Sequence, residues 1–139
     1  MNHSDIPISY VPVDLGGGYS DALGMVHLDA DAQRICFRVT AAQLNPVATL
    51  HGGALATFCD AQIIALFGSP LCWDAHFPTI SLSTDFLAPA REGDLVEADV
   101  LLVKQTRTMV FTQCLIRVGE DVIGRSSAIY RRPSGITLA

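Results

Sequence analysis

The sequence predicts an α+β fold in which an antiparallel sheet of five to six strands wraps around one central, buried helix. The helix prediction rests on residues 53–67, which run without proline and are apolar on nearly every face. A helix that is apolar all round is buried on all sides. The sheet prediction rests on strand-like stretches with short connections, which favour antiparallel pairing. A sheet that encloses a single helix satisfies both observations.

The predicted elements follow one another in a simple order. Residues 23–28 and 34–39 alternate in character and flank a short turn, so they predict a hairpin. The helix comes next and ends at Gly68-Ser69-Pro70, which are residues that stop helices. Four further strands are then predicted, at residues 79–87, 94–104, 108–118 and 122–130.

The ends of the chain bound the domain. Residues 1–19 contain Gly16-Gly17-Gly18 and are expected to form an irregular N-terminal arm. With 139 residues, the whole chain 1–139 is expected to be one domain. The N-terminus has no basic segment followed by an apolar one, so no secretory signal is expected, and the predicted location is cytoplasmic.

Composition excludes some classes of partner. Half of the residues are hydrophobic and only 17% are charged, which suggests surface buried between subunits. The net charge of −5 makes a nucleic-acid partner unlikely, because such proteins usually need a basic face. No run of about 18 apolar residues is present, so no membrane span is expected.

The cysteines and histidines do not suggest a metal centre. Four cysteines, at positions 36, 59, 72 and 114, form no C-x-x-C pair and sit among apolar residues, so they are expected to be buried, reduced thiols. The four histidines lack the spacing of a zinc site. Neither a metal nor a cofactor is therefore expected.

Asp60 is the most unusual residue of the predicted helix. Its short side chain competes for backbone hydrogen bonds, so aspartate is a poor residue in mid-helix. Burying its carboxylate without a partner would be costly. Two interpretations stay open: Asp60 caps another segment or pairs with a buried arginine, or it faces a cavity as a functional group.

Gly52 and Gly53 mark the start of the same helix. The first N–H groups of a helix lack intrahelical acceptors and carry partial positive charge. Glycine lets a ligand approach this backbone closely, so the pair can form an oxyanion hole. The alternative is a turn that merely needs glycine.

The distance between Gly52 and Asp60 predicts a dimer. A helix rises ~1.5 Å per residue, so the two positions lie roughly 12 Å apart along the axis. That is too far for both to act on one carbonyl within one chain. If they cooperate, a second subunit brings its own helix alongside, antiparallel, and the sites lie at the interface of a homodimer.

These residues together resemble the signature of a known family. Asn45-Pro46, His51-Gly52-Gly53, Asp60 and the later Phe86-Leu87-Ala88-Pro89 are similar to the motifs of hotdog-fold acyl-CoA thioesterases of the phenylacetyl-CoA and 4-hydroxybenzoyl-CoA type. The similarity covers roughly residues 20 to 132. It implies a hotdog fold, hydrolysis of an acyl-CoA thioester without a cofactor, and a homodimer that assembles to a homotetramer.

The resemblance also implies roles for five catalytic residues. The N–H of Gly52 polarises the thioester carbonyl. Asp60 of the facing subunit acts as general base on water or as nucleophile. Asn45 shapes the loop and binds near the thioester or the water. His51 lies beside the thioester, unless it is only a turn residue at the helix start. Thr79, ten positions before the proline of F-x-x-P, orients the water.

Four further residues are predicted to bind substrate. Gly53 lies at the helix start, and Phe58 and Ile63 are expected to line an acyl pocket, unless they are plain core residues. Ser81 is a weaker hydroxyl candidate next to Thr79. Five basic residues are candidates for contacts to CoA phosphates, but each is better explained as an ordinary solvated charge and none is counted as a site residue: Arg91, Lys104, Arg107, Arg131 and Arg132.

Other functions within the same fold are weighed against hydrolysis. His76-Phe77-Pro78 is similar to a motif of hotdog dehydratases, but there it precedes the central helix, so it is interpreted here as coincidental. An enoyl-CoA hydratase or dehydratase and a non-catalytic acyl-CoA-binding protein are the alternatives. Asp60 favours the hydrolase, because a pure binder has no need of a buried carboxylate.

Overall fold

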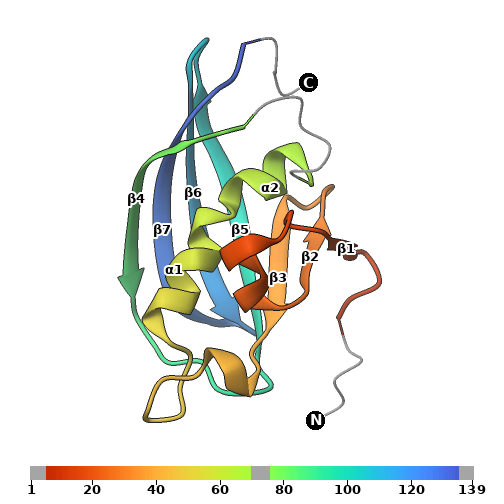
Figure 1. The fold of residues 1–139 in the computed structure, drawn as a ribbon, viewed down its shortest axis with the longest axis vertical. Helices are drawn as coiled ribbons and strands as arrows, with labels where there is room; N and C mark the ends of the chain where they lie inside the picture. Colours follow the sequence, from red (N-terminus) through yellow and green to blue (C-terminus); the bar gives the residue numbers. More distant parts are fainter. Residues whose placement is uncertain (1–5, 70–75, 135–139) are drawn as a thin grey trace.

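Seven strands form one antiparallel sheet in the computed structural model, which describes residues 6–69 and 76–134 (Figure 1). The order of strands across the sheet is β1-β2-β3-β5-β6-β7-β4, so β1 and β4 are its edges. The strands are β1 (Val11–Val13), β2 (Val26–Asp29), β3 (Arg34–Arg38), β4 (Thr79–Phe86), β5 (Leu95–Gln105), β6 (Met109–Val118) and β7 (Asp121–Arg131).

The helical segment lies across one face of this sheet. It consists of α1 (Gly52–Asp60) and α2 (Gln62–Phe67), and in Figure 1 it runs diagonally over the strands. The inner strand residues alternate with outward ones, as in β6, where Val110, Cys114 and Ile116 are buried. The predicted arrangement of an antiparallel sheet around a central helix is confirmed.

The N-terminal part is more ordered than predicted. β1 lies within the arm expected to be irregular and pairs antiparallel with β2, which raises the strand count above the predicted five to six. A 3-10 helix, η1 (Gly18–Leu23), follows it, and Leu23 is buried in the core. The first strand of the predicted hairpin therefore begins at Val26 and not at residue 23, after a turn at Gly24 with φ +70°.

The central helix is not continuous, which corrects the prediction of one helix over residues 53–67. Ala61 leaves the helical conformation, with φ −85° and ψ 8°, and separates α1 from α2. The helix is also not buried on every side. Leu55, Phe58 and Cys59 of α1 are buried, but Gly52, Gly53 and Asp60 are exposed in the single chain.

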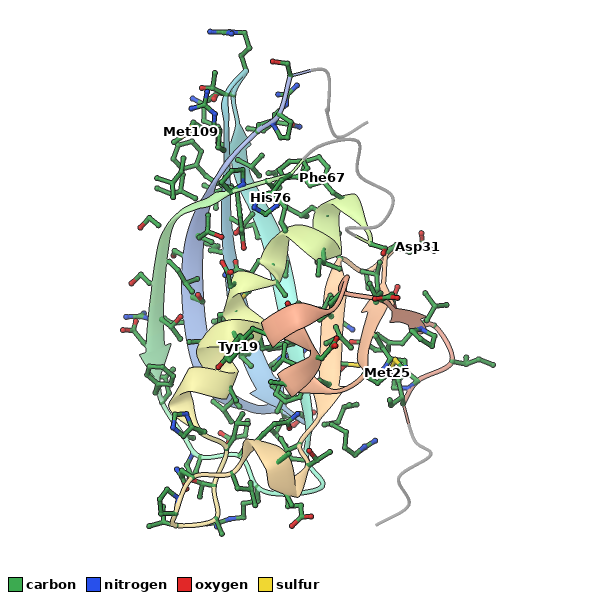
Figure 2. The ribbon with its side chains drawn as sticks, viewed as in Figure 1. Tyr19, Met25, Asp31, Phe67, His76 and Met109 are labelled. Atoms are coloured by element: carbon green, nitrogen blue, oxygen red, sulfur yellow. The ribbon has the colours of Figure 1, made fainter. Side chains whose placement is uncertain are left out.

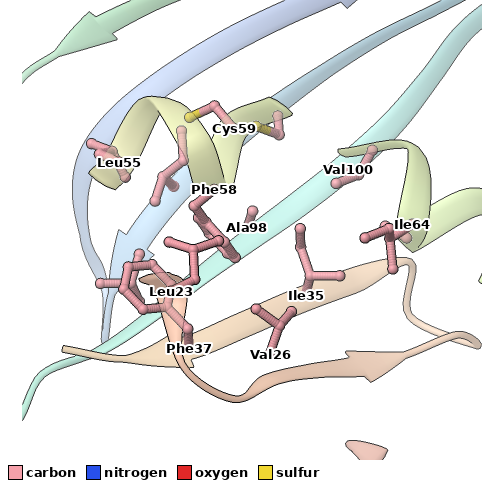
Figure 3. Close-up of a cluster of buried hydrophobic side chains, with 14 of the residues drawn as sticks. Leu23, Val26, Ile35, Phe37, Leu55, Phe58, Cys59, Ile64, Ala98 and Val100 are labelled. Atoms are coloured by element: carbon pink, nitrogen blue, oxygen red, sulfur yellow. The ribbon is translucent and has the colours of Figure 1, made fainter. Parts of the chain in front are cut away.

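The core fills the space between the helices and the inner face of the sheet (Figure 3). Phe58 is fully buried and packs on Phe37 of β3, with ring centroids 4.7 Å apart. Leu23 and Val26 join them from the N-terminal elements. A large apolar side chain contributes about 1.5–3 kcal/mol on full burial, so this contact fixes α1 on the sheet.

The three described cysteines are free and buried, as predicted, and Cys72 lies outside the described residues. Burial raises the pKa of the Cys36 thiol to about 12, which keeps it protonated and unreactive. Within residues 6–69 and 76–134 there is no group of three side chains suited to hold a metal ion. The helices described are also too short to cross a membrane.

Candidate active site

The loop that leads into α1 is closed by Asn45. Its side-chain Nδ2 donates to Thr49 Oγ1 at 2.8 Å, and its Oδ1 accepts from the backbone N–H groups of Val47 and Thr49 at 3.1 and 3.0 Å. Ala48 has φ +62°, the left-handed conformation that glycine adopts most easily. Asn45 therefore shapes this loop with its whole amide, while the predicted contact to substrate or water stays a prediction.

His51 caps the N-terminus of α1. Its Nδ1 accepts a hydrogen bond from the Gly53 N–H at 2.8 Å, and its own backbone N–H donates to the Gln43 carbonyl at 2.8 Å. A Cβ on Gly53 would lie only 2.9 Å from His51 Nδ1. In this structure Gly53 thus has a structural role, because its N–H is occupied and its missing side chain makes room for the cap.

Gly52 leaves its N–H free. It is the first residue of α1, and within the described residues this N–H has no acceptor. The Phe86 ring lies beside it, 3.5 Å from the position a Cβ would take. A cavity of about 390 Å³ brings Gly52 together with the F-x-x-P segment 86–89. The two motifs far apart in the sequence therefore meet at one end of the helix.

Asp60 ends α1 and receives two hydrogen bonds from the sheet. Thr79 Oγ1 donates to its Oδ1 at 2.7 Å, and the Tyr130 hydroxyl donates to its backbone carbonyl at 2.8 Å. The ion pairs of the described residues join other groups, so none of them reaches Asp60. The buried-arginine interpretation of Asp60 is therefore wrong for the part of the chain described here.

Asp60 faces a cavity of about 620 Å³ on the helix side of the sheet. The two other predicted site residues in its lining are Thr79 and Ile63. The remaining lining residues come from the N-terminal segment, the helices, the start of β4 and β7: Leu15, Tyr19, Ser20, Leu23, Ala56, Thr57, Ala61, Ile64, His76, Phe77, Leu82 and Tyr130. The site thus combines one carboxylate, hydroxyls and apolar walls.

Phe58 does not line this cavity, which corrects its predicted role in substrate binding. It lies two residues before Asp60, so on a helix of about 3.6 residues per turn its side chain points to roughly the opposite side. There it is fully buried against Phe37. Phe58 is a core residue, the alternative that the sequence left open.

Ser81 also lies away from Asp60. Residues two apart in a regular strand share a face, which would place Ser81 beside Thr79. The register of β4 against β7 shifts between these residues, however: Thr79 lies opposite the buried Tyr130, and Ser81 lies opposite Ile129. This β-bulge turns Ser81 to the outer face of the sheet, so it is not a neighbour of the carboxylate.

Two residues that line the cavity, His76 and Tyr19, were not predicted from the sequence. His76 lines the cavity although its motif was interpreted as coincidental. Tyr19 comes from η1, in the arm predicted to be irregular. Figure 2 shows Tyr19 beside α1 and His76 beside α2. Short 3-10 helices have no strong sequence signal.

The electrostatics keep the Tyr130 hydroxyl protonated, as its hydrogen bond to the Asp60 carbonyl requires. Burial raises the pKa of the Tyr130 hydroxyl far above its usual range, and the nearby charge of Asp60 raises it further. The hydroxyl therefore stays protonated and remains a donor. Since Tyr130 is 1% exposed, water does not compete for this bond.

Gly52 and Asp60 remain at opposite ends of α1. Each lines a cavity of its own: Gly52 lines the cavity of about 390 Å³ and Asp60 lines the cavity of about 620 Å³. One subunit by itself thus offers a free N–H at one place and a carboxylate at another.

Comparison with known proteins identifies the family. A family model described as the thioesterase superfamily matches residues 48–125, which include the start of α1, Asp60 and the F-x-x-P segment. The chain belongs to the thioesterase superfamily. Membership in this superfamily supports the predicted hydrolase activity.

Two curated relatives of this thioesterase carry the name "Putative esterase". The relative from Pseudomonas aeruginosa is 26% identical over 93% of this chain and 98% of its own length. The relative from Deinococcus radiodurans is 29% identical over 83% of this chain and 77% of its own length.

Solved structures with low sequence identity share the fold. An asparagine-to-aspartate variant of phenylacetic acid degradation protein PaaI from Thermus thermophilus matches with a TM-score of 0.64 and 17% identity, covering 89% of this chain and 93% of that chain. A hypothetical thioesterase from Streptococcus pneumoniae, solved with coenzyme A, matches with a TM-score of 0.62 and 19% identity, covering 88% and 86%. The hotdog fold predicted from the motifs is confirmed.

Proposed function

We propose that this thioesterase hydrolyses acyl-CoA, with Asp60 of one subunit and the Gly52 N–H of the facing subunit at each active site. The observation that carries the proposal is the state of Asp60: an exposed carboxylate that opens on a cavity and is held by the Thr79 hydroxyl. A carboxylate with that setting is suited to activate water. The coenzyme A of the pneumococcal neighbour supports CoA as the thiol carrier.

The separation of the two groups supports a shared site. Gly52 and Asp60 stand at opposite ends of α1, and the face of α1 that carries them is exposed in the single chain. An antiparallel second helix would bring the Gly52 of one chain near the Asp60 of the other twice, once at each end. The edge strand β4, with exposed Ile80, offers a surface next to α1 for such pairing.

The chemistry follows from these groups. The Gly52 N–H donates to the thioester oxygen, and Asp60 takes a proton as water attacks the carbonyl carbon. Negative charge on the oxygen of the tetrahedral intermediate is stabilised by the N–H and the helix terminus. The carbon–sulfur bond then breaks and CoA leaves as a thiolate. In the alternative route Asp60 itself attacks and water hydrolyses the mixed anhydride.

Thr79 has a distinct part in this scheme. Its hydroxyl donates to Oδ1 of Asp60, which leaves Oδ2 to accept the proton of water. Orientation of the carboxylate by one hydrogen bond keeps the base within reach of the reacting atom.

The proposal is tested by thiol release from a panel of short, medium, long and aryl acyl-CoA substrates. Asp60→Asn should lower turnover by at least about 10², the usual value of general-base catalysis. Asp31→Asn is the matched control, because Asp31 is also exposed but lies in the turn between β2 and β3, away from β4 and outside the lining of the cavity. Wild-type turnover in Asp60→Asn would exclude Asp60 from the mechanism.

Absence of thiol release over the whole panel would exclude the thioesterase itself. If the folded protein then retained acyl-CoA in equilibrium dialysis, the non-catalytic binder would replace the proposal. Water addition to an enoyl-CoA under the same conditions would identify the hydratase.

A further inference from the structure

We propose that Tyr130 is a positioning residue that aims the Asp60 carboxylate by holding the backbone where the central helix breaks. The inference rests on the proposed function, since it concerns the base of that reaction. Tyr130 is assigned no role by the sequence motifs, and its hydroxyl is the only side-chain donor to the Asp60 backbone within the described residues.

The first observation is that two cross-strand partners bind the two halves of Asp60. Thr79 on β4 and Tyr130 on β7 lie directly opposite each other in the sheet. The Thr79 hydroxyl donates to the carboxylate at 2.7 Å, and the Tyr130 hydroxyl donates to the carbonyl of the same residue at 2.8 Å. The side chain and the backbone of Asp60 are therefore both held by one cross-strand pair of residues.

The second observation is that the backbone at this place is not held by a regular helix. Ala61 has ψ 8°, and the N–H groups of Ala61 and Ile64 donate to carbonyls only three residues earlier, Phe58 and Ala61, at 3.0 Å. Asp60 is thus the last residue of α1, and its carbonyl is the one that receives Tyr130. The last carbonyls of a helix lack intrahelical donors, so this bond completes the helix end.

The third observation is that a buried polar network anchors the other side of the break. Gln62 is fully buried, and its Nε2 donates to the Cys59 carbonyl at 3.0 Å and to Ser126 Oγ at 3.2 Å. Its Oε1 accepts from Thr112 Oγ1 at 2.9 Å. The chain before and after Ala61 is therefore bound to β6 and β7, and Tyr130 is the part of this binding that reaches Asp60 itself.

Removal of the Tyr130 hydroxyl should act on the rate and not on binding. The carbonyl of Asp60 would lose its donor, the end of α1 could rotate, and the carboxylate would move relative to Thr79. A misplacement of about 1 Å can cost up to about 10² in rate. For Tyr130→Phe we expect kcat to fall about 10-fold, with KM nearly unchanged, since a loss confined to the transition state lowers kcat and kcat/KM equally.

Tyr10→Phe is the matched control. Tyr10 is buried like Tyr130, and its hydroxyl donates to Glu97 at 2.6 Å, but it lies outside the lining of the Asp60 cavity. The two variants lose the same atom and a similar hydrogen bond. If the effect of Tyr130→Phe is mere loss of stability, both variants will have the same kcat when measured well below their melting temperatures.

Two further measurements keep the inference separate from the proposed function. In an Asp60→Asn background Tyr130→Phe should lower the residual rate by less than it does in the wild type, because the group that it positions is gone. Ala61→Gly, which loosens the same break without removing a side-chain hydrogen bond, should lower kcat in the same direction as Tyr130→Phe.

The outcomes are distinct. An active wild type, a defective Asp60→Asn and a Tyr130→Phe variant with wild-type kcat would overturn the positioning role and leave the thioesterase proposal intact. An increase in KM at constant kcat would also overturn it, since that would make Tyr130 a binding residue. An inactive wild type would instead overturn the proposed function.

Discussion

Asp60 and His51 show how single residues prepare opposite ends of one short helix. His51 uses its Nδ1 to occupy the Gly53 N–H, which leaves the Gly52 N–H as the free donor at the N-terminus of α1. At the other end the carbonyl of Asp60 is occupied by Tyr130, while its carboxylate faces the cavity. At each end of α1 one backbone group is occupied by a hydrogen bond. A second polar group, the Gly52 N–H at one end and the Asp60 carboxylate at the other, remains open to a ligand.

The first prediction at this scale concerns Gly53. A Cβ there would lie 2.9 Å from His51 Nδ1, whereas a Cβ on Gly52 would make an ordinary contact of 3.5 Å with Phe86. Loss of an N-terminal cap costs about 0.5–2 kcal/mol, and replacement of glycine by alanine in a helix returns up to about 1 kcal/mol. Gly53→Ala should therefore be less stable than Gly52→Ala in urea unfolding. Equal midpoints would mean that the His51 cap contributes nothing.

The second prediction concerns Thr79. Thr79→Val keeps the shape of the side chain but removes the donor to Asp60 Oδ1. We expect kcat to fall by about 10-fold or more, because the carboxylate is no longer oriented. Thr79→Ser restores the hydroxyl and should recover most of the rate. A rate in Thr79→Ser as low as in Thr79→Val would assign the effect to the methyl group and its packing.

At the scale of elements, the break at Ala61 divides the central helix into α1 and α2 directly after Asp60. Nothing local requires it, because alanine is the best helix former and neither glycine nor proline is near. The reason is instead tertiary, since the Gln62 side chain directly after the break is bound to Thr112 and Ser126 on two strands. The break thus separates the site residue Asp60 from the buried core residue Gln62.

Replacement of Gln62 tests how much its buried hydrogen bonds stabilise the fold. Gln62→Met is similar in shape but leaves the Cys59 carbonyl, Ser126 and Thr112 each with one partner fewer. A buried group that loses its partner costs about 1–3 kcal/mol, so the urea midpoint should fall clearly. Gln113→Met, an exposed position on the outer face of β6, is the matched control and should unfold like the wild type. Similar urea midpoints for both variants would contradict the stabilising role of the Gln62 hydrogen bonds.

These elements also show how far the sequence could lead. Alternation of residues predicted most strands and their antiparallel pairing, and the signature residues led to Asp60, Gly52 and Thr79. The break at Ala61 could not be predicted, because it depends on β6 and β7, fifty or more residues away. The bulge that turns Ser81 outward likewise depends on the register with β7. The position of Phe58, in contrast, could have been derived from helical periodicity alone.

At the scale of the whole molecule, the single chain is complete as a fold and incomplete as the proposed site. The sheet ends at β4, whose Ile80 and Phe86 are more than half exposed, and this edge borders the helix that carries Gly52 and Asp60. The opposite edge, β1, is a strand of only three residues. The edge next to the site is thus the longer of the two, and it exposes two large apolar side chains, Ile80 and Phe86, where β1 exposes Val11.

A charge at that edge should separate subunits and abolish activity together. Ile80→Glu places a carboxylate on the exposed edge, so we expect a shift to lower mass in sedimentation velocity and a parallel loss of thiol release. Val11→Glu, at the exposed opposite edge, should leave both unchanged. A fully active monomer from Ile80→Glu would contradict the shared site.

The bulge between Thr79 and Ser81 has a consequence for how this chain can vary. Ile80 is the extra residue of this bulge, so Thr79 and Ser81 lie opposite the consecutive residues Tyr130 and Ile129 and face opposite sides of the sheet. Deletion of Ile80 would remove the bulge: Thr79 and Ser81 would become neighbours opposite Tyr130 and Ile129, and every later position of β4 would keep its face. The strand is therefore expected to tolerate the loss of this one residue, whereas loss of a single residue from the regular part 81–86 would turn the positions beyond it to the other face of the sheet.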